Sequence, residues 1–203
     1  MSFNQQAKDW DNDPVKVERA KVFAKEIANF IPRDKKMKAL EFGCGTGLLS
    51  YHLKDFFESI TLVDTSENML EVLREKISRD YLSHFKPVLI DLINDDLNDS
   101  AFDVIYTLMT MHHIIDPDKI LKKFNSLLKP NGYICIADLV KEDGSFHSGI
   151  PGFRGHNGFD KDELAKILNK NGFEVVSYKI CYEIEKDKRK YPLFLMIGEK
   201  VYN

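Results

Sequence analysis

The chain has 203 residues, 43% of them apolar, and its 29 basic and 32 acidic side chains leave a formal net charge of −3. This length and composition predict a single globular domain over residues 1–203. The charge balance provides no positive field for a polyanion, so we expect no nucleic-acid partner. The polar first residues do not resemble a signal peptide, and no apolar run is long enough to span a membrane. Three cysteines without zinc-finger or Cys-x-x-Cys spacing, Cys44, Cys135 and Cys181, favour a reduced, cytoplasmic protein.

The first half of the chain alternates helical and extended patterns. Asp13 and Pro14 predict the start of a helix, and Pro32 ends its apolar periodicity, so residues 1–32 form an N-terminal segment and helix. Short apolar runs predict strands, and apolar residues three and four apart predict helices between them. The predicted strands span 37–42, 60–63, 88–90 and 102–108, and the helices between them begin near residues 48 and 66.

A further helix opens at Asp116, and we expect Asn131 and Gly132 to end it in a left-handed turn. The apolar run that follows predicts a strand over 133–140. A loop over 141–158, rich in glycine and histidine, separates this strand from the last helix.

The last third of the chain predicts one helix and a hairpin. Asp160 and Glu163 form a capping box, and two extended segments over 173–184 and 191–201 are joined by the charged run 185–190. Short apolar strands alternating with helices predict an α/β fold with a doubly wound, mostly parallel sheet of seven strands and an antiparallel C-terminal strand. Such sheets bind ligands at the carboxyl ends of their strands.

A glycine-rich turn follows the first predicted strand. Gly43, Gly45 and Gly47 occupy alternate positions, and glycine allows the backbone to approach a ligand closely. Glu41 places a carboxylate inside the apolar strand, where burial without a partner would cost at least the roughly 2–7 kcal/mol of a neutral polar group. We therefore expect a partner for Glu41, which a cationic or donor-rich ligand could supply. The alternative, an ordinary strand-to-helix turn, rarely needs three glycines in five residues.

The stretch Glu41-Phe42-Gly43-Cys44-Gly45-Thr46-Gly47 resembles the first motif of class I S-adenosylmethionine (SAM) dependent methyltransferases, which is an acid, any residue, then Gly-x-Gly-x-Gly. The resemblance implies a Rossmann-like methyltransferase fold with SAM as the cofactor. It also implies which residues surround the amino-acid portion of SAM: Glu41, Gly43, Cys44, Gly45 and Gly47. A nicotinamide-dependent dehydrogenase, the nearest competitor, would need glycine or alanine at Leu48, and a kinase-type phosphate loop would need Gly-Lys-Ser/Thr.

Two more acids end the next two predicted strands. Asp64 stands where a carboxylate can accept both ribose hydroxyls, or it caps the following helix together with Thr65 or Ser66. In the family, the acid at the place of Asp91 binds the adenine amino group, and the next backbone N–H, here that of Leu92, reaches a ring nitrogen. A surface-loop acid is the alternative for Asp91. We count Thr65 and Met69 with the cofactor site, although the spacing of Met69 also suits the core.

The segment Asp9-Trp10-Asp11 resembles the lid of the ubiquinone/menaquinone-biosynthesis-like, small-molecule subgroup, in which an aromatic residue folds over the cofactor. The alternative is that Trp10 anchors the first helix. The fourth strand continues into residues 107–114, which in the family pass under the sulfonium, so Thr107 joins the cofactor set. The ending His112-His113-Ile114 resembles the same subgroup.

Methyl transfer is an in-line displacement in which the protein aligns the reactants and excludes water, and a base is needed only if the acceptor loses a proton. His112 is the first candidate base because the strand end places it near the methyl group, and His147 is the second. His113 and His156 are further candidates, and a hydrogen-bonded structural histidine is the alternative for each.

The loop 141–158 mixes aromatic, histidine and arginine side chains, which predicts a pocket for a small, partly polar or anionic acceptor; a flexible connecting loop is the alternative. We expect no metal site, because Asp138 is followed by Leu139 and not by a second chelating group, as a catechol-type centre would need.

Together these features predict a methyltransferase that moves a methyl group from SAM to an oxygen, nitrogen or carbon atom of a small molecule and releases S-adenosylhomocysteine (SAH). Nucleic-acid methylation is disfavoured, because residues 107–114 contain no Asn/Asp-Pro-Pro-aromatic motif and no cysteine follows a proline. Two alternatives stay open, a SAM-binding scaffold without catalysis and an NAD-dependent dehydrogenase.

Overall fold

The computed structural model describes residues 3–34, 36–98, 101–150 and 152–201. The first two residues of the N-terminal segment, and Pro151 of the loop 141–158, lie outside the described residues. The described chain contains a seven-stranded sheet with the order β3-β2-β1-β4-β5-β7-β6, in which β7 is antiparallel to both of its neighbours. The predicted α/β fold is therefore confirmed. The strands are β1 (Lys38–Phe42), β2 (Ser59–Asp64), β3 (Phe85–Leu89), β4 (Phe102–Leu108), β5 (Leu128–Leu139), β6 (Phe173–Lys186) and β7 (Arg189–Lys200).

The helices begin where the sequence places capping side chains. Asp13 accepts hydrogen bonds from the backbone of Val15 and Lys16 at the start of α2, and Ser66, Asp116 and Asp160 cap three later helices in the same way. The α-helices are α1 (Phe3–Gln6), α2 (Pro14–Phe30), α3 (Leu48–His52), α4 (Glu67–Arg79), α5 (Pro117–Leu127) and α6 (Lys161–Lys170). Short 3₁₀ segments are η1 (Ala7–Asn12), η2 (Met111–His113) and η3 (Ser145–His147).

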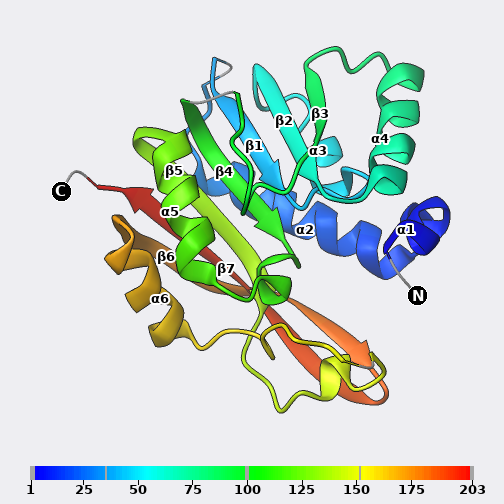
Figure 1. Cartoon of the computed structure of the whole chain (residues 1–203), viewed down its shortest axis with the longest axis vertical. Coiled ribbons are helices and arrows are strands. Elements are labelled where there is room, and N and C mark those ends of the chain that lie inside the picture. Colours follow the sequence, from blue (N-terminus) through cyan, green and yellow to red (C-terminus); the bar gives the residue numbers. More distant parts are fainter. Residues whose placement is uncertain (1–2, 35, 99–100, 151, 202–203) are drawn as a thin grey trace.

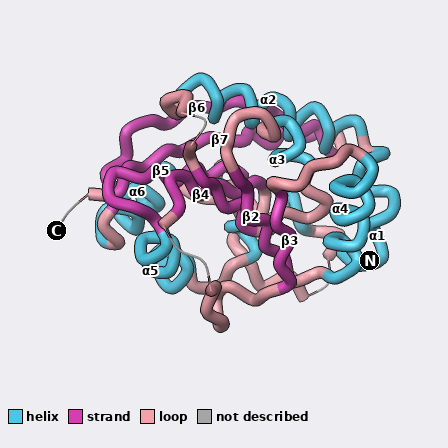
Figure 2. The backbone as a smooth tube through the Cα atoms, turned by 90° about the horizontal axis from the view of Figure 1, so that it is seen from above, coloured by secondary structure: helices cyan, strands magenta, loops and turns pink. Residues whose placement is uncertain are grey.

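Helices lie on both faces of the sheet, with α2 and α3 on one side and α5 and α6 on the other (Figure 2). Successive strand residues point to opposite faces. In β4, Val104 and Tyr106 pack in the core that includes residues of α2, α3 and α4. Ile105 packs in the second core, with residues of α5 and α6. This double burial explains why the strands read as continuous apolar runs.

The strand order changes direction between the parallel strands β1 and β4. The chain adds β2 and β3 on one side of β1, and then adds β4 and β5 on its other side. In doubly wound sheets this switch point marks the ligand crevice at the carboxyl ends of the strands. The glycine turn follows β1 at this place. In Figure 1 the loop 141–158 and the tip of the β6–β7 hairpin extend beyond the sheet at the end toward which the β4 arrow points. No helix of the described residues is long and apolar enough to cross a membrane.

Several predicted boundaries are wrong: the strand predicted over 88–90 is β3, Phe85–Leu89, and the strand predicted over 133–140 already begins at Leu128. The helix expected to run to Asn131 and Gly132 ends at Leu127, because Leu128 turns extended and pairs with Phe102 of β4. Asn131 has the expected left-handed φ of 59°, but it lies within the residues assigned to β5.

The spacing of Leu49, Leu53 and Phe56 predicts a longer helix after the glycine turn, but α3 ends at His52, where the N–H of Leu53 closes a tight turn on the carbonyl of Ser50. In the hairpin only Asp187 and Lys188 form the turn, both with positive φ, as two-residue hairpin turns require. The rest of the charged run 185–190 therefore continues the strands.

Candidate active site

The glycine turn after β1 is shaped by close contacts. Gly43, Gly45 and Gly47 have φ values of 66°, 54° and 76°, a left-handed conformation that favours glycine. A Cβ atom added at Gly43 would lie 2.3 Å from the side chain of Thr110, and one at Gly47 would lie 2.7 Å from Leu73. Both positions require glycine so that the turn can pack against neighbouring elements.

Gly45 is different, because a Cβ atom added there would make only ordinary van der Waals contacts. A Cβ atom built there has the Trp10 indole nitrogen and the Met69 sulfur as its nearest neighbours, both at 3.9 Å. The N–H of Gly45 donates to Asp64 at 2.7 Å, and the other carboxylate oxygen of Asp64 accepts from the N–H of Ser66 at 2.8 Å. The structure thus brings four predicted residues together around one turn.

The capping alternatives after β2 are resolved by the same contacts. The Ser66 hydroxyl accepts from the N–H of Met69 at 3.3 Å and is the N-cap of α4, whereas the Thr65 side chain is exposed. Cys44 is buried, its N–H donates to the carbonyl of Val63, and burial raises the pKa of its thiol. Cys44 therefore holds the turn against β2 through its backbone, and its side chain is a thiol and not a thiolate.

Glu41 has the partner that its buried position requires, and the chain itself supplies it. Both the hydroxyl and the N–H of Ser50 donate to the Glu41 carboxylate, and the Ser50 hydroxyl also lies 2.7 Å from the Tyr106 hydroxyl. Burial raises the pKa of Glu41 to about 8, and the hydrogen bonds from Ser50 oppose that rise. Glu41 thus holds the glycine turn to α3 and β4.

The third acid lies beside the second. The N–H of Ile90 donates to the carbonyl of Asp64 at 3.0 Å, so the ends of β2 and β3 are joined just before Asp91. The Asp91 carboxylate accepts from the N–H of Ile93 at 3.1 Å and from the Asn94 amide at 2.7 Å. Leu92 is buried in the α5-side core. Asp64 and Asp91 therefore follow adjacent strands at one edge of the sheet.

Thr107 is placed differently from the other predicted cofactor residues. Its side chain is fully buried, and its hydroxyl donates to the Phe42 carbonyl at 2.9 Å. This bond ties β4 to β1 and leaves the hydroxyl inside the sheet. Thr110, three residues later, is the side chain that contacts the turn, where its hydroxyl donates to the carbonyl of Gly43 at 3.3 Å.

A partly buried ion pair that we did not predict joins the segment before α2 to the glycine turn. We call its three residues, Asp11, Thr46 and Lys76, the clasp. The Asp11 carboxylate accepts from the Thr46 hydroxyl and from the Lys76 ammonium, the latter at 2.6 Å. Lys76 also donates to the Thr46 carbonyl at 2.9 Å. The sequence signal was a lysine on the apolar stripe of α4, which needs a partner when it is buried. Trp10 lies beside this clasp, with the Lys16 ammonium 4.2 Å from its ring centroid.

His112 is held rigidly at the end of β4. Its Nδ1 lies 2.6 Å from Asp138, and its backbone N–H donates to the other carboxylate oxygen at 3.1 Å. The N–H of Leu139 adds a third hydrogen bond to Asp138. Because a carboxylate only accepts hydrogen bonds, Nδ1 of His112 carries the proton in this contact. Sequence analysis named Asp138 only to argue against a catechol-type metal site and missed this role.

The loop 141–158 brings the second predicted histidine to the first. The ring centroids of His147 and His112 are 4.9 Å apart, and Phe153 stacks on His147 at 3.9 Å. The N–H of His156 donates to the His112 carbonyl at 2.7 Å. Burial, with His112 close by, lowers the pKa of His113 and of His147 to about 4, so both rings are neutral at neutral pH.

Arg19 on α2 is a further candidate that sequence analysis missed. Burial lowers the pKa of the Arg19 guanidinium, and the charges of Asp13 and Asp138 oppose that shift. Its Nε atom is buried without a hydrogen-bond partner among the described residues. An arginine with a spare donor suits an anionic group of an acceptor.

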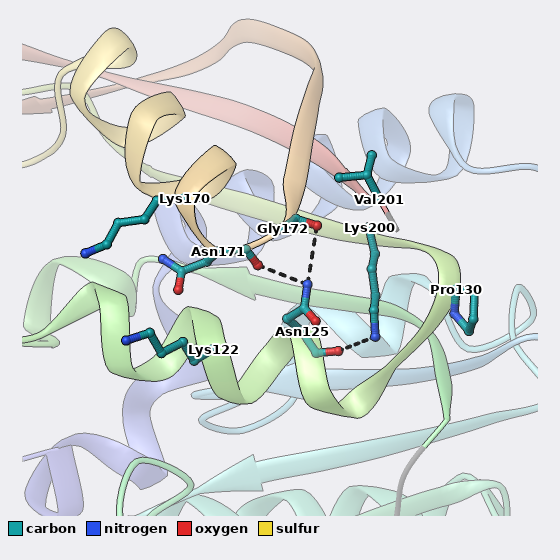
Figure 3. A pocket seen from close by; sticks show the side chains of 8 residues that line it. All are labelled: Lys122, Asn125, Pro130, Lys170, Asn171, Gly172, Lys200 and Val201. Carbon is teal, nitrogen blue, oxygen red and sulfur yellow. Dashed lines mark hydrogen bonds between the residues drawn. The ribbon is translucent and has the colours of Figure 1, made fainter. Parts of the chain in front are cut away.

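A pocket of about 530 Å³ lies away from these residues (Figure 3). Gly172 precedes β6 and Lys200 ends the antiparallel β7, so this pocket lies at the amino-terminal edge of the parallel strands. The Asn125 amide donates to the carbonyls of Asn171 and Gly172, and Lys200 donates to the carbonyls of Asn125 and Leu128. These bonds satisfy helix-end carbonyls, which is a structural role.

Comparisons with known proteins agree with this geometry. Residues 16–178 match the family described as Methyltransferase domain. An uncharacterized methyltransferase of Schizosaccharomyces pombe is 30% identical over 193 residues, which are 82% of this chain and 68% of that protein. A ubiquinone biosynthesis O-methyltransferase of Coxiella burnetii is 28% identical over 141 residues, 68% of this chain and 59% of that protein. A sterol 4-C-methyltransferase of Caenorhabditis elegans is 31% identical over 116 residues, 57% of this chain and 35% of that protein.

Solved structures share the fold. A chain in the complex between the Haloferax volcanii Trm112 methyltransferase activator and a methyltransferase has a TM-score of 0.83 at 16% identity, covering 99% of this chain and 98% of that one. Phosphoethanolamine N-methyltransferase 2 of Haemonchus contortus, solved with phosphomonomethylethanolamine and SAH, has a TM-score of 0.73 at 16% identity, covering 100% of this chain and 61% of that one. With the family match over most of its length, the chain belongs to the class I SAM-dependent methyltransferases.

Proposed function

We propose that the chain transfers the methyl group of SAM to a small-molecule acceptor held between the end of β4 and the loop 141–158. The observation that carries this proposal is the buried His112–Asp138 pair, 2.6 Å apart, next to that loop and on the strand after which Thr110 contacts the glycine turn. Two of the similar proteins are named for small-molecule acceptors, in ubiquinone biosynthesis and as a phosphoethanolamine N-methyltransferase.

The residues around the glycine turn fit SAM. A Cβ atom added at Gly45 would have no neighbour closer than 3.9 Å, so the backbone there is not crowded, and carboxylates lie at the ends of two adjacent strands, as ribose and adenine recognition needs. In this proposal the backbone of the turn binds the amino-acid portion, Asp64 the ribose, Asp91 and Leu92 the adenine, and Trp10 covers the site. The assigned residues are Trp10, Glu41, Gly43, Cys44, Gly45, Gly47, Asp64, Met69, Asp91 and Leu92, with Glu41 acting through Ser50.

SAM, when bound, supplies a methyl group that its sulfonium has already activated. The chain's own part is to align the acceptor, exclude water and take up a proton if the acceptor releases one. Nε2 of His112 is the atom that takes this proton, because Asp138 holds the ring with Nδ1 protonated and stabilises the imidazolium that forms. His147 and Phe153 close the loop side of the acceptor space, and Arg19 donates to an anionic group of the acceptor.

Calorimetric titration with SAH and with NAD tests the cofactor assignment, and micromolar binding of NAD without binding of SAH contradicts it. A panel of phenols, catechols, amines and phosphorylated amines, incubated with methyl-labelled SAM, tests the acceptor class. We expect His112→Gln to lower kcat on the best acceptor by about 10²–10⁴-fold while SAH affinity is kept. SAH binding without transfer to any acceptor in the panel would instead favour a SAM-binding scaffold.

We also propose that the segment before α2, the sheet and the loop 141–158 form a single catalytic domain. We place this domain in the cytoplasm. Cys44, Cys135 and Cys181 are all unpaired, which agrees with a reducing compartment. Subcellular fractionation of the native host, with the protein detected by antibody, tests this placement. Detection of the protein in the fraction of an oxidising compartment contradicts it.

A further inference from the structure

We propose that His112, His113 and His147 form a binding site for a divalent transition-metal ion of the zinc class. Each ring offers one nitrogen, and the three nitrogens lie within 4.8 Å of one another. The ring centroids of His112 and His113 are 4.1 Å apart, and those of His113 and His147 are 5.8 Å apart. The proposal concerns metal binding, and it does not depend on methyl transfer.

The distances are close to those of a tetrahedral centre. At the zinc–nitrogen length of about 2.0–2.1 Å, two imidazole nitrogens on one ion stand roughly 3.4 Å apart. The widest pair here must therefore close by about 1.4 Å. Side-chain rotation and a small shift of η3 can supply this, since His147 belongs to a loop, whereas His112 and His113 are fixed on η2 by the hydrogen bond from the N–H of His113 to Thr110.

Two further observations point to an ion. Nδ1 of His147 is buried and has no hydrogen-bond partner within the described part of the chain, which is unfavourable unless something binds it. His112 donates Nδ1–H to Asp138 at 2.6 Å, and a carboxylate on the far nitrogen is the usual way in which a metal-binding imidazole is oriented and made more basic. Nε2 of His112 is then the atom that binds the ion, so it does not accept a proton from the acceptor while the ion is bound.

Three imidazoles select the metal class. Neutral nitrogen ligands suit zinc, iron, nickel and copper, whereas calcium and magnesium require oxygen ligands. Three protein ligands leave a fourth position open in a tetrahedral zinc site. An ion with an open position would lower the pKa of an acceptor hydroxyl that coordinates it, and this consequence rests on the proposed function.

The sequence around Asp138 predicted no metal site, because Leu139 follows it in place of a second chelating group. The three histidines come from two segments 34 residues apart in the chain, and only the path of the loop 141–158 brings them together. His156, which the same loop carries, lies outside the group of three and provides a matched control.

The experiment uses the full chain after treatment with a chelator. Competition titration of Zn²⁺ against a chromophoric chelator should show one equivalent bound with a micromolar or lower Kd. Co²⁺ should give the intense visible absorption of a tetrahedral site. His147→Gln and His113→Gln should each weaken Zn²⁺ binding at least tenfold, Asp138→Asn should weaken it by about 10–100-fold, and His156→Gln should leave it unchanged.

Two readouts keep the result interpretable. SAH titration of each variant reports whether it has folded, and a chain that binds Zn²⁺ but not SAH contradicts the proposed function while it supports the metal site. If a variant does not fold, nitrogen-15 NMR of the wild type replaces it: of the six histidines, His112, His113 and His147 should shift with one equivalent of Zn²⁺. Absence of stoichiometric binding, unchanged binding in folded His147→Gln, or shifts confined to other histidines overturns the proposal.

Discussion

The Lys76 ammonium lies 2.6 Å from the Asp11 carboxylate and joins α4 to the segment before α2. The lysine side chain is 10% exposed and the aspartate 28%, so solvent screens the pair less than a surface pair. Both side chains also bind Thr46, which lies between two glycines of the turn. The position of the N-terminal segment is therefore coupled to the shape of the turn.

We expect Asp11 and Lys76 to stabilise the fold cooperatively. In a double-mutant cycle with Asp11→Asn and Lys76→Met, urea unfolding should give a coupling energy of about 1–3 kcal/mol, because each residue loses its partner in a partly buried place. SAH affinity measured over the same four proteins should show coupling of the same sign, since the clasp holds Trp10 beside Gly45.

The exposed pair Lys141–Glu163 is the control. Its atoms are 2.9 Å apart, but its side chains are 57% and 64% exposed, so its coupling energy should be about 0–1 kcal/mol. A value for Asp11–Lys76 no larger than this control would mean that the clasp does not stabilise the lid.

We expect Asp64 both to bind the cofactor and to stabilise the glycine turn. Asp64→Ala removes the acceptor for the ribose hydroxyls and also the acceptor for the N–H of Gly45, so SAH binding should weaken by at least about 1–3 kcal/mol. Calorimetry measures this, and Asp95→Ala, an exposed acid in the loop after β3, should leave affinity unchanged. Equal SAH affinity in wild type and Asp64→Ala would reduce Asp64 to a capping residue.

The pKa of Glu41 predicts how stability varies with pH. The folded chain raises this pKa from 4.5 to about 8, so between these values the folded state binds a proton that the unfolded state releases. Stability should therefore fall as pH rises from about 4.5 to 8, by at most on the order of 5 kcal/mol. Glu41→Gln removes the titration, so the stability of the variant relative to wild type should increase over this window in urea unfolding.

The same substitution at the exposed Glu18 controls for the change from carboxylate to amide and should leave the pH dependence of the wild type intact. A constant difference in unfolding free energy between Glu41→Gln and wild type from pH 4.5 to 8 would contradict the raised pKa.

Much of the fold was predictable because its signals are local. The predicted strand over 102–108 coincides with β4, and Asp13 and Asp160 cap helices as expected. The end of α5 was not predictable. Asn131 favours a left-handed turn in any setting, and only the pairing of Leu128 with Phe102 shows that the helix has already ended.

The same distinction between local signals and long-range contacts applies to the site. Glu41, Asp64 and Asp91 follow from strand ends and a motif, so sequence places them in order. The partner of Glu41 was required by burial, but its identity, Ser50, depends on how α3 packs. Contacts between Asp11 and Lys76, or between His112 and His147, join residues far apart in the chain, and no periodicity or spacing encodes them.

The last prediction separates backbone strain from ligand contact at Gly45. Gly45 and Gly152 have φ values of 54° and 74°, and the nearest atom to an added Cβ is 3.9 Å away at Gly45, while none lies within 4 Å at Gly152. Either glycine replaced by alanine should therefore lose about 1–2 kcal/mol of unfolding free energy from the left-handed conformation alone. Only Gly45→Ala places its methyl group in the space where SAM approaches the backbone, so it should bind SAH at least tenfold more weakly than Gly152→Ala. Equal SAH affinity in the two variants would mean that the cofactor does not contact the turn at Gly45.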